Sequence, residues 1–252
     1  MNFITAFYKE LLEQRRTRKF LIALVVLALF GMTSPLMAKM TPQIMTLVPG
    51  GEAYAFLIPT PTINDAVMQY VKNITQFGVL LALVFSMGAM AVEKDKGTAA
   101  MILAKPMPRG SFLMAKFSAL AVTFSIALII AGVSCYYYTF FLFGELNIAN
   151  WLVLNGLVLI YILLYVAITL FYSTLTRTQY VAIGLSFGTL ILLGILGALP
   201  GFGQNFPDAM ISNASLLMAG QAVTNWNSLW VSLGLLICSL VGAWLLFRKQ
   251  EL

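Results

Sequence analysis

The residues best suited to specific contacts lie in a polar interruption between two long apolar runs. Four charged residues end one run at positions 93–96, helix formers follow at 98–105, and Pro106 ends that stretch. If the two apolar runs cross a membrane, a short helix with an apolar edge between them either lies on the lipid surface or inserts into a partner protein. The alternative is a charged hairpin that only reverses the chain. Ser111 is the expected N-cap of the next helix. The candidate contact residues are Glu93, Lys94, Asp95, Lys96, Gly97, Thr98, Met101, Ile102, Leu103, Pro106 and Arg109.

Catalytic chemistry finds no support in the residue types. The sequence contains no His, which excludes a Ser–His hydrolase and a His-ligated metal site. Cys135 and Cys238 lie inside apolar runs and form no disulfide framework. No G-x-x-x-x-G-K-[ST] motif occurs, so this chain does not hold ATP in a P-loop. We therefore expect no catalytic, cofactor-binding or metal site, and ATP-driven work would need another polypeptide.

The composition shows that the solvent of this chain is largely lipid. Hydrophobic residues make up 60% and charged residues 10% of its 252 positions, against about 45–50% and about 25% in soluble domains. A bilayer core needs roughly 20 apolar residues per helix. Such runs predict an all-α membrane protein with six spans, at about 20–37, 74–92, 117–143, 151–173, 180–199 and 228–247.

The basic residues predict the orientation of these spans. With both termini inside, thirteen Lys and Arg residues are cytoplasmic and only Lys39 and Lys72 are outside. The net charge of +6 is then a topology signal rather than a nucleic-acid patch. We expect a multi-pass protein of the plasma membrane of a prokaryote. The cytoplasmic set is Lys9, Arg15, Arg16, Arg18, Lys19, Lys94, Lys96, Lys105, Arg109, Lys116, Arg177, Arg248 and Lys249.

Residues 1–19 predict an amphipathic helix that lies in the membrane interface. Its apolar residues fall at helical spacing, with Lys9 and Glu13 on the opposite side. The first span is too long for the apolar region of a signal peptide, so we expect it to be retained. Beyond the spans, residues 38–66 show turn chemistry without periodicity, and a short outer helix is expected from Pro207 to Gly220.

Small residues recur at four-residue spacing in the second and fifth spans. They are Gly78, Ala82 and Ser86, and then Gly184 and Gly188. Such spacing allows close helix approach in lipid, which more often serves internal packing than a dimer or pathway face. No ionisable residue falls in the middle of a predicted span, which disfavours ion-coupled transport and charge-selective pores. The substrate is therefore expected to be at least partly apolar.

The segment at 93–116 resembles the signature of the type-2 exporter class of ATP-binding-cassette (ABC) permeases. That pattern places a Glu at the end of the second span, then Gly-Thr, a short apolar helix, a Pro, an Arg and a Lys. The matching positions here are Glu93, Gly97, Thr98, Met101, Ile102, Leu103, Pro106, Arg109 and Lys116. The surface helix, the six spans and the outer helix resemble the same class more loosely.

The resemblance implies a division of labour between chains. Two permease chains, identical or homologous, pair with two ATPase subunits that carry ATP and Mg. The segment after the second span is then the coupling helix, seated in a cleft of the ATPase, and the second and fifth spans line the pathway near the dimer axis. The implied function is export of a hydrophobic or amphipathic substrate. A self-contained carrier or channel, and a scaffold subunit without transport activity, stay open as alternatives.

Overall fold

The computed structural model describes residues 2–47, 60–97, 108–223 and 225–250. All regular structure in these ranges is helical, which confirms the predicted all-α membrane protein. The helices are α1 (Phe3–Arg16), α2 (Lys19–Thr46), α4 (Ile63–Ser86), α5 (Ala91–Asp95), α7 (Arg109–Phe143), α8 (Ile148–Leu175), α9 (Gln179–Gly197), the 3-10 turn η1 (Gly203–Asn205), α10 (Pro207–Met218) and α11 (Asn227–Lys249).

Within the described ranges, six stretches are long and apolar enough to cross a membrane. They are α2, α4 together with α5, α7, α8, α9 and α11, in agreement with the six predicted spans. Large apolar side chains are exposed along these helices, above all on α9 and α11, as expected for helices that face lipid. The described chain is therefore a multi-pass membrane protein.

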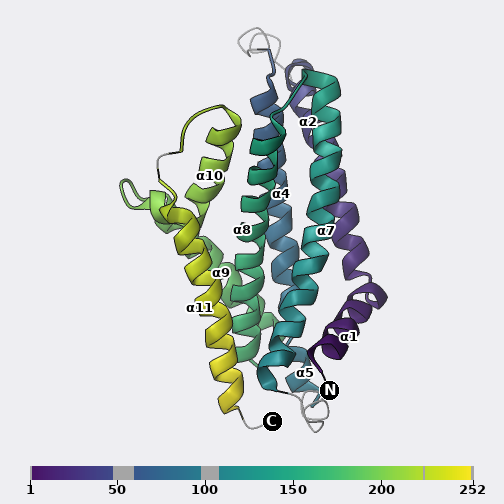
Figure 1. The fold of residues 1–252 in the computed structure, drawn as a ribbon, viewed down its shortest axis with the longest axis vertical. Coiled ribbons are helices and arrows are strands. Elements are labelled where there is room, and N and C mark those ends of the chain that lie inside the picture. Colours follow the sequence, from purple (N-terminus) through teal and green to yellow (C-terminus); the bar gives the residue numbers. More distant parts are fainter. Residues whose placement is uncertain (1, 48–59, 98–107, 224, 251–252) are drawn as a thin grey trace.

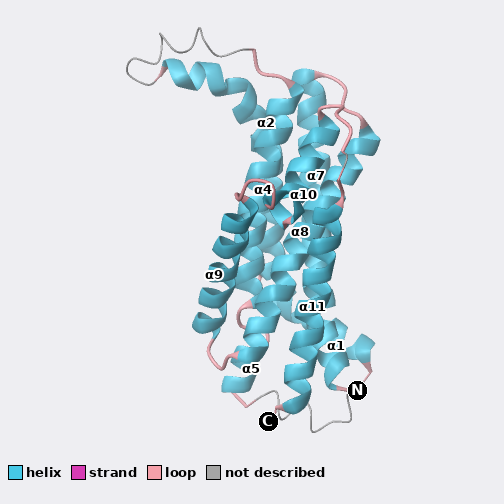
Figure 2. Cartoon of the chain, turned by 90° about the vertical axis from the view of Figure 1, so that its left-hand side faces the viewer, coloured by secondary structure: helices cyan, strands magenta, loops and turns pink. Residues whose placement is uncertain are grey.

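Helices α2, α4, α7 and α8 form a central bundle, and α9, α10 and α11 pack on α8 (Figure 1). The bundle core is apolar and aromatic, with Tyr70, Ile74, Phe124 and Leu154 fully buried. Helices α1 and α5 and the C-terminus lie at one end of the bundle, which we call the base (Figures 1 and 2). Helix α10 lies toward the opposite end, beyond α9 and α11.

Some predicted boundaries are wrong because local sequence signals were overridden by packing. Helix α2 continues to Thr46 through Pro35 and Pro42, although residues 38–46 were predicted as loop. Membrane helices tolerate proline where neighbouring groups satisfy the freed backbone. Helix α7 begins at Arg109 after Pro108, so Ser111 is not its N-cap.

Of three further predictions about segments outside or at the ends of the spans, one is confirmed, one is corrected and one lies outside the described residues. The short helix predicted from Pro207 is confirmed as α10, with Gly220 in the left-handed conformation (φ +74°) just beyond it. The second span begins at Ile63 rather than near residue 74, and a turn at 87–90 separates α4 from α5. The helix predicted over 98–105 lies outside the described residues.

Candidate functional site

A buried ion-pair cluster at the base joins three helices. The Lys116 ammonium of α7 donates to Oε1 of Glu10 on α1 at 3.0 Å and to Oε1 of Glu93 on α5 at 2.9 Å. Lys9 lies 3.2 Å from the same Glu10 atom and 3.4 Å from the same Glu93 atom. We call these four residues the basal cluster. Two ammonium groups balance two carboxylates, which offsets much of the cost of removing them from water.

The charges of the basal cluster are shielded from water to different degrees. The Lys116 side chain is 3% exposed, whereas that of Lys9 is 39% exposed. Partial burial alone would lower the pKa of Lys9, but the carboxylates of Glu10 and Glu93 outweigh it and raise that pKa. Glu13 also lies near the cluster, 3.8 Å from Lys9. Lys9 and Lys116 thus link these carboxylates into one ion-pair network.

Helix α1 docks through its polar side and exposes apolar side chains. Glu10 and Gln14, one turn apart, are buried, and Thr123 of α7 donates a hydrogen bond to Gln14 Oε1. Phe3, Ile4 and Tyr8 are exposed. A helix that satisfies its polar groups within the bundle and leaves an apolar side outward is suited to the membrane interface.

The turn between α4 and α5 is held by a single serine of α8. Ser173 Oγ accepts hydrogen bonds from the amides of Met90 and Ala91, each at 3.0 Å, and donates to the Met87 carbonyl at 2.7 Å. Lys94 Nζ donates to the Thr174 carbonyl at the end of the same helix. Three backbone groups that the interrupted helix leaves unpaired are thereby satisfied, and α5 is fixed to the base of α8.

Arg109 anchors the other side of the 93–109 segment. Its guanidinium donates to the carbonyls of Phe247, Arg248 and Gln250 at 2.7–2.9 Å. These carbonyls belong to the C-terminal turn of α11 and the residue after it, where a cation is favoured by the helix dipole. Both described flanks of the predicted coupling segment are therefore tied to the bundle, one to α8 and one to α11.

The predicted coupling residues thus divide into groups. Glu93 lies in the basal cluster, and Lys94 and Arg109 bind helix ends. Asp95, Lys96 and Gly97 are exposed at the last described positions before the gap. The remaining members lie outside the described residues: Thr98, Met101, Ile102, Leu103 and Pro106.

The predicted small-residue positions also occupy two environments. Gly78, Ala82 and Ser86 face the bundle interior, and a Cβ at Gly78 would come within 2.7 Å of Ile162 on α8. Gly184 and Gly188 are exposed, with no atom within 4 Å of a Cβ built there. The second span therefore turns its small residues inward, with Gly78 against α8, whereas the fifth presents Gly184 and Gly188 outward.

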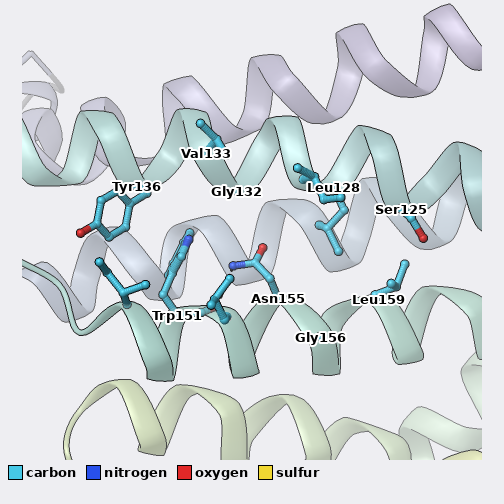
Figure 3. Close-up of a pocket in the computed structure, with 12 residues that line it drawn as sticks. Ser125, Leu128, Gly132, Val133, Tyr136, Trp151, Asn155, Gly156 and Leu159 are labelled. Carbon is cyan, nitrogen blue, oxygen red and sulfur yellow. Dashed lines mark hydrogen bonds between the residues drawn. The ribbon is translucent and has the colours of Figure 1, made fainter.

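An apolar cavity of about 390 Å³ lies between α7 and α8, distant from the basal cluster (Figure 3). Tyr136 and Trp151 line one end of it, and Ser125 lines the other. Asn155 is one of the few polar residues in its wall, and its amide already accepts from Tyr70 and donates to the Trp151 carbonyl. The cavity offers an incoming molecule chiefly apolar contact.

Two features of the site were not found from the sequence. The first is the docking of α1, in which Glu10 pairs with Lys116 and Gln14 accepts from Thr123, both on α7. Helical spacing places Glu10 and Gln14 on one side of α1 but does not identify the helix that they contact. The second is Asp208, which was placed in a short outer helix, whereas its carboxylate accepts a hydrogen bond from Tyr161 in the middle of α8.

Comparison with known proteins agrees with this architecture. The profile of the ABC-2 family transporter proteins matches residues 4–252. The uncharacterized transmembrane protein YxlG of Bacillus subtilis (strain 168) is 21% identical over 250 residues, which cover 96% of each chain. The family match runs through all the apolar helices of the described bundle. This chain therefore belongs to the ABC-2 transporter family, as a transmembrane permease subunit and not the part that binds ATP.

Proposed function

We propose that this chain is the permease of an ATP-driven exporter and that its base docks on a separate ABC ATPase. The basal cluster carries the proposal, because it ties α1, α5 and α7 together beside the predicted coupling segment. Two copies of the ATPase and a second permease chain, identical or homologous, complete the transporter. ATP and Mg bind to the ATPase.

The contacts at the base support a mechanical role for the segment between α5 and α7. A displacement of this segment acts on Glu93 and Arg109, which are bonded to α7 and to the end of α11. Lys94 links the same segment to α8. Because buried charge pairs resist separation, force applied at the exposed residues 95–97, which we call the tip, is passed to several spans at once.

Charge supports the location and orientation of the transporter. The base carries α1, α5, the start of α7 and the C-terminal end of α11, which hold eight of the fifteen Lys and Arg residues. We place this end in the cytoplasm of a prokaryotic cell and the α10 end outside the plasma membrane. The apolar spans and the α7–α8 cavity suit a hydrophobic or amphipathic substrate, moved outward.

Association with the ATPase tests the proposal. The tagged chain is expressed with the ABC ATPase encoded beside it, and the ATPase retained on gentle purification is measured. We expect the double variant Asp95→Lys/Lys96→Glu, at the exposed tip, to retain at least tenfold less ATPase and to lose coupled ATP hydrolysis. The control Glu145→Lys, exposed at the opposite end, retains it fully.

Two results would overturn the proposal. One is purification of the chain without an ATPase under every gentle condition. The other is full ATPase retention and stimulation by the tip variant, which would make the segment a simple reverse turn. Polar replacement of Ile102, in the segment outside the described residues, is a second variant expected to uncouple the transporter while leaving membrane insertion intact.

A further inference from the structure

One carboxylate of the described chain lies far from both ends of the bundle. Tyr161 stands midway along α8, roughly 20 Å from either end of that helix, and its hydroxyl donates to Asp208 Oδ1 at 2.7 Å. The other described acidic residues lie at the base or near the opposite end. Asp208 is half-buried at the start of α10, which packs along the outer half of α8 through the Asn150–Leu217 hydrogen bond (Figure 1).

Asp208 has no basic partner in the described part of the chain. All described ion pairs belong to the base, around Lys9 and Lys116. The first turn of α10 favours a negative charge at this position, as does the Tyr161 hydroxyl. Neither group supplies a full positive charge. A carboxylate without a counterion near the middle of a membrane-spanning bundle is unfavourable in free energy, and such residues usually serve binding or transport.

Two glycines of α9 and a second tyrosine of α8 surround the carboxylate. The second oxygen, Oδ2, faces α9 where a Cβ at Gly197 would come within 3.2 Å and one at Gly194 within 3.8 Å. Glycine at these two positions lets the carboxylate lie close to the α9 backbone. Tyr165, one turn from Tyr161 on the same side of α8, is fully buried, and its hydroxyl interacts with that of Tyr161 without forming a hydrogen bond of ordinary geometry. The two rings pack edge to face, 5.2 Å apart.

We infer that Asp208, with Tyr161 and Tyr165, binds the cationic group of an amphipathic substrate. The carboxylate supplies the opposite charge, the tyrosine rings add cation–π attraction, and the Tyr165 hydroxyl accepts or donates one hydrogen bond. The inference rests on the proposed transport function and narrows its substrate to organic cations with an apolar body. A bound cation would give Asp208 the counterion that the described chain does not provide in the middle of the bundle.

The test uses two ions of similar size and opposite charge, tetraphenylphosphonium and tetraphenylborate. Binding is measured to the purified full-length chain, without ATPase, in nanodiscs of neutral phosphatidylcholine, with empty nanodiscs subtracted. We expect Asp208→Asn, which keeps the acceptor for Tyr161, to weaken tetraphenylphosphonium binding at least tenfold. Asp208→Glu should retain most of the binding, and Glu145→Gln, at an exposed carboxylate, should equal the unaltered chain. Tetraphenylborate binding should not change in any variant.

Three outcomes would overturn the inference. Equal tetraphenylphosphonium binding by the unaltered chain and Asp208→Asn would mean that the carboxylate carries a proton or does not contact the ligand. Displacement of the bound cation by sodium at constant ionic strength would assign the site to an inorganic ion. If Asp208→Asn lowered the thermal stability and weakened the binding of both ions equally, Asp208 would be a structural residue. In that case Tyr161→Phe would also lower the thermal stability and weaken the binding of both ions. ATPase association is not measured here, so failure of this site leaves the coupling proposal standing.

Discussion

Lys116 shows how a charge can be useful inside an apolar chain. Its ammonium is almost fully buried, yet it contacts carboxylates from α1 and α5, which are distant in sequence. Buried ion pairs seldom add net stability, but they penalise arrangements that leave one member unpaired. The basal cluster therefore specifies how α1 and α5 sit on α7, where apolar contact alone would permit sliding.

Replacing Lys116 with Met should destabilise the protein more than its loss of contact area suggests. Glu10 and Glu93 would be left partly buried without their main cation, a change that costs about 3 kcal/mol. Thermal unfolding in detergent measures this loss. Lys72→Met, at an exposed lysine of α4, should be nearly neutral. Adding Glu10→Gln and Glu93→Gln to Lys116→Met should restore stability, and a triple variant no better than the single one would contradict a charge effect.

Ser173 is expected to control the local stability of α5. Its replacement by Ala leaves the amides of Met90 and Ala91 without an acceptor, at a cost of about 1–3 kcal/mol. Hydrogen exchange of the Ala91 amide should accelerate while exchange in the middle of α8 stays unchanged. Ser239→Ala, which removes a hydroxyl bonded only within its own helix, is the control. Unchanged exchange at Ala91 would show that the turn is held by other contacts.

The number of membrane-spanning helices could be predicted from the sequence, but their exact ends and the docking of α1 could not. Apolar runs identified six spans because lipid exposure imposes the same composition on every crossing helix. Proline and serine rules misplaced the ends of α2 and α7, since they describe isolated helices and not helices supported by neighbours. The polar docking of α1 could not be predicted, because Glu10 finds its partner 106 positions away.

The crossing of α2 and α7 depends on one glycine. A Cβ at Gly31 would overlap the Ala131 carbonyl of the α7 backbone, which no rotamer change can relieve. Gly31→Ala should therefore separate the two helices and cost roughly 1–3 kcal/mol. Gly234→Ala, on α11 with open space around it, should be neutral or slightly stabilising because alanine favours helix. Equal unfolding temperatures for the two variants would mean that the bundle adjusts at this crossing without cost.

The complete molecule has a core and a partly covered side. Helices α2, α4, α7 and α8 bury one another, whereas α9 buries only Ala182, Ser186 and Leu193. In a monomer, lipid would cover the exposed apolar surface of α9. In a transporter with a pathway between two permeases, a second copy of the chain would cover it. The spacing of small residues in α4 and α9 was visible in the sequence. Only the structure shows that Gly184 and Gly188 of α9 lie on an exposed side, while the small residues of α4 are buried.

We therefore expect α9 to meet a second copy of the chain in the membrane. Gly188→Cys, in a chain whose exposed Cys238 is replaced by Ala, should form oxidised dimers in native membranes, because small residues let two helices approach closely. Ile129→Cys, on the exposed side of α7, should form few. Cross-linked dimers are counted by gel electrophoresis with and without reductant, at low expression to limit random collision. Equal cross-linking at both positions would contradict an α9 interface, because random encounters in lipid do not distinguish the two helices.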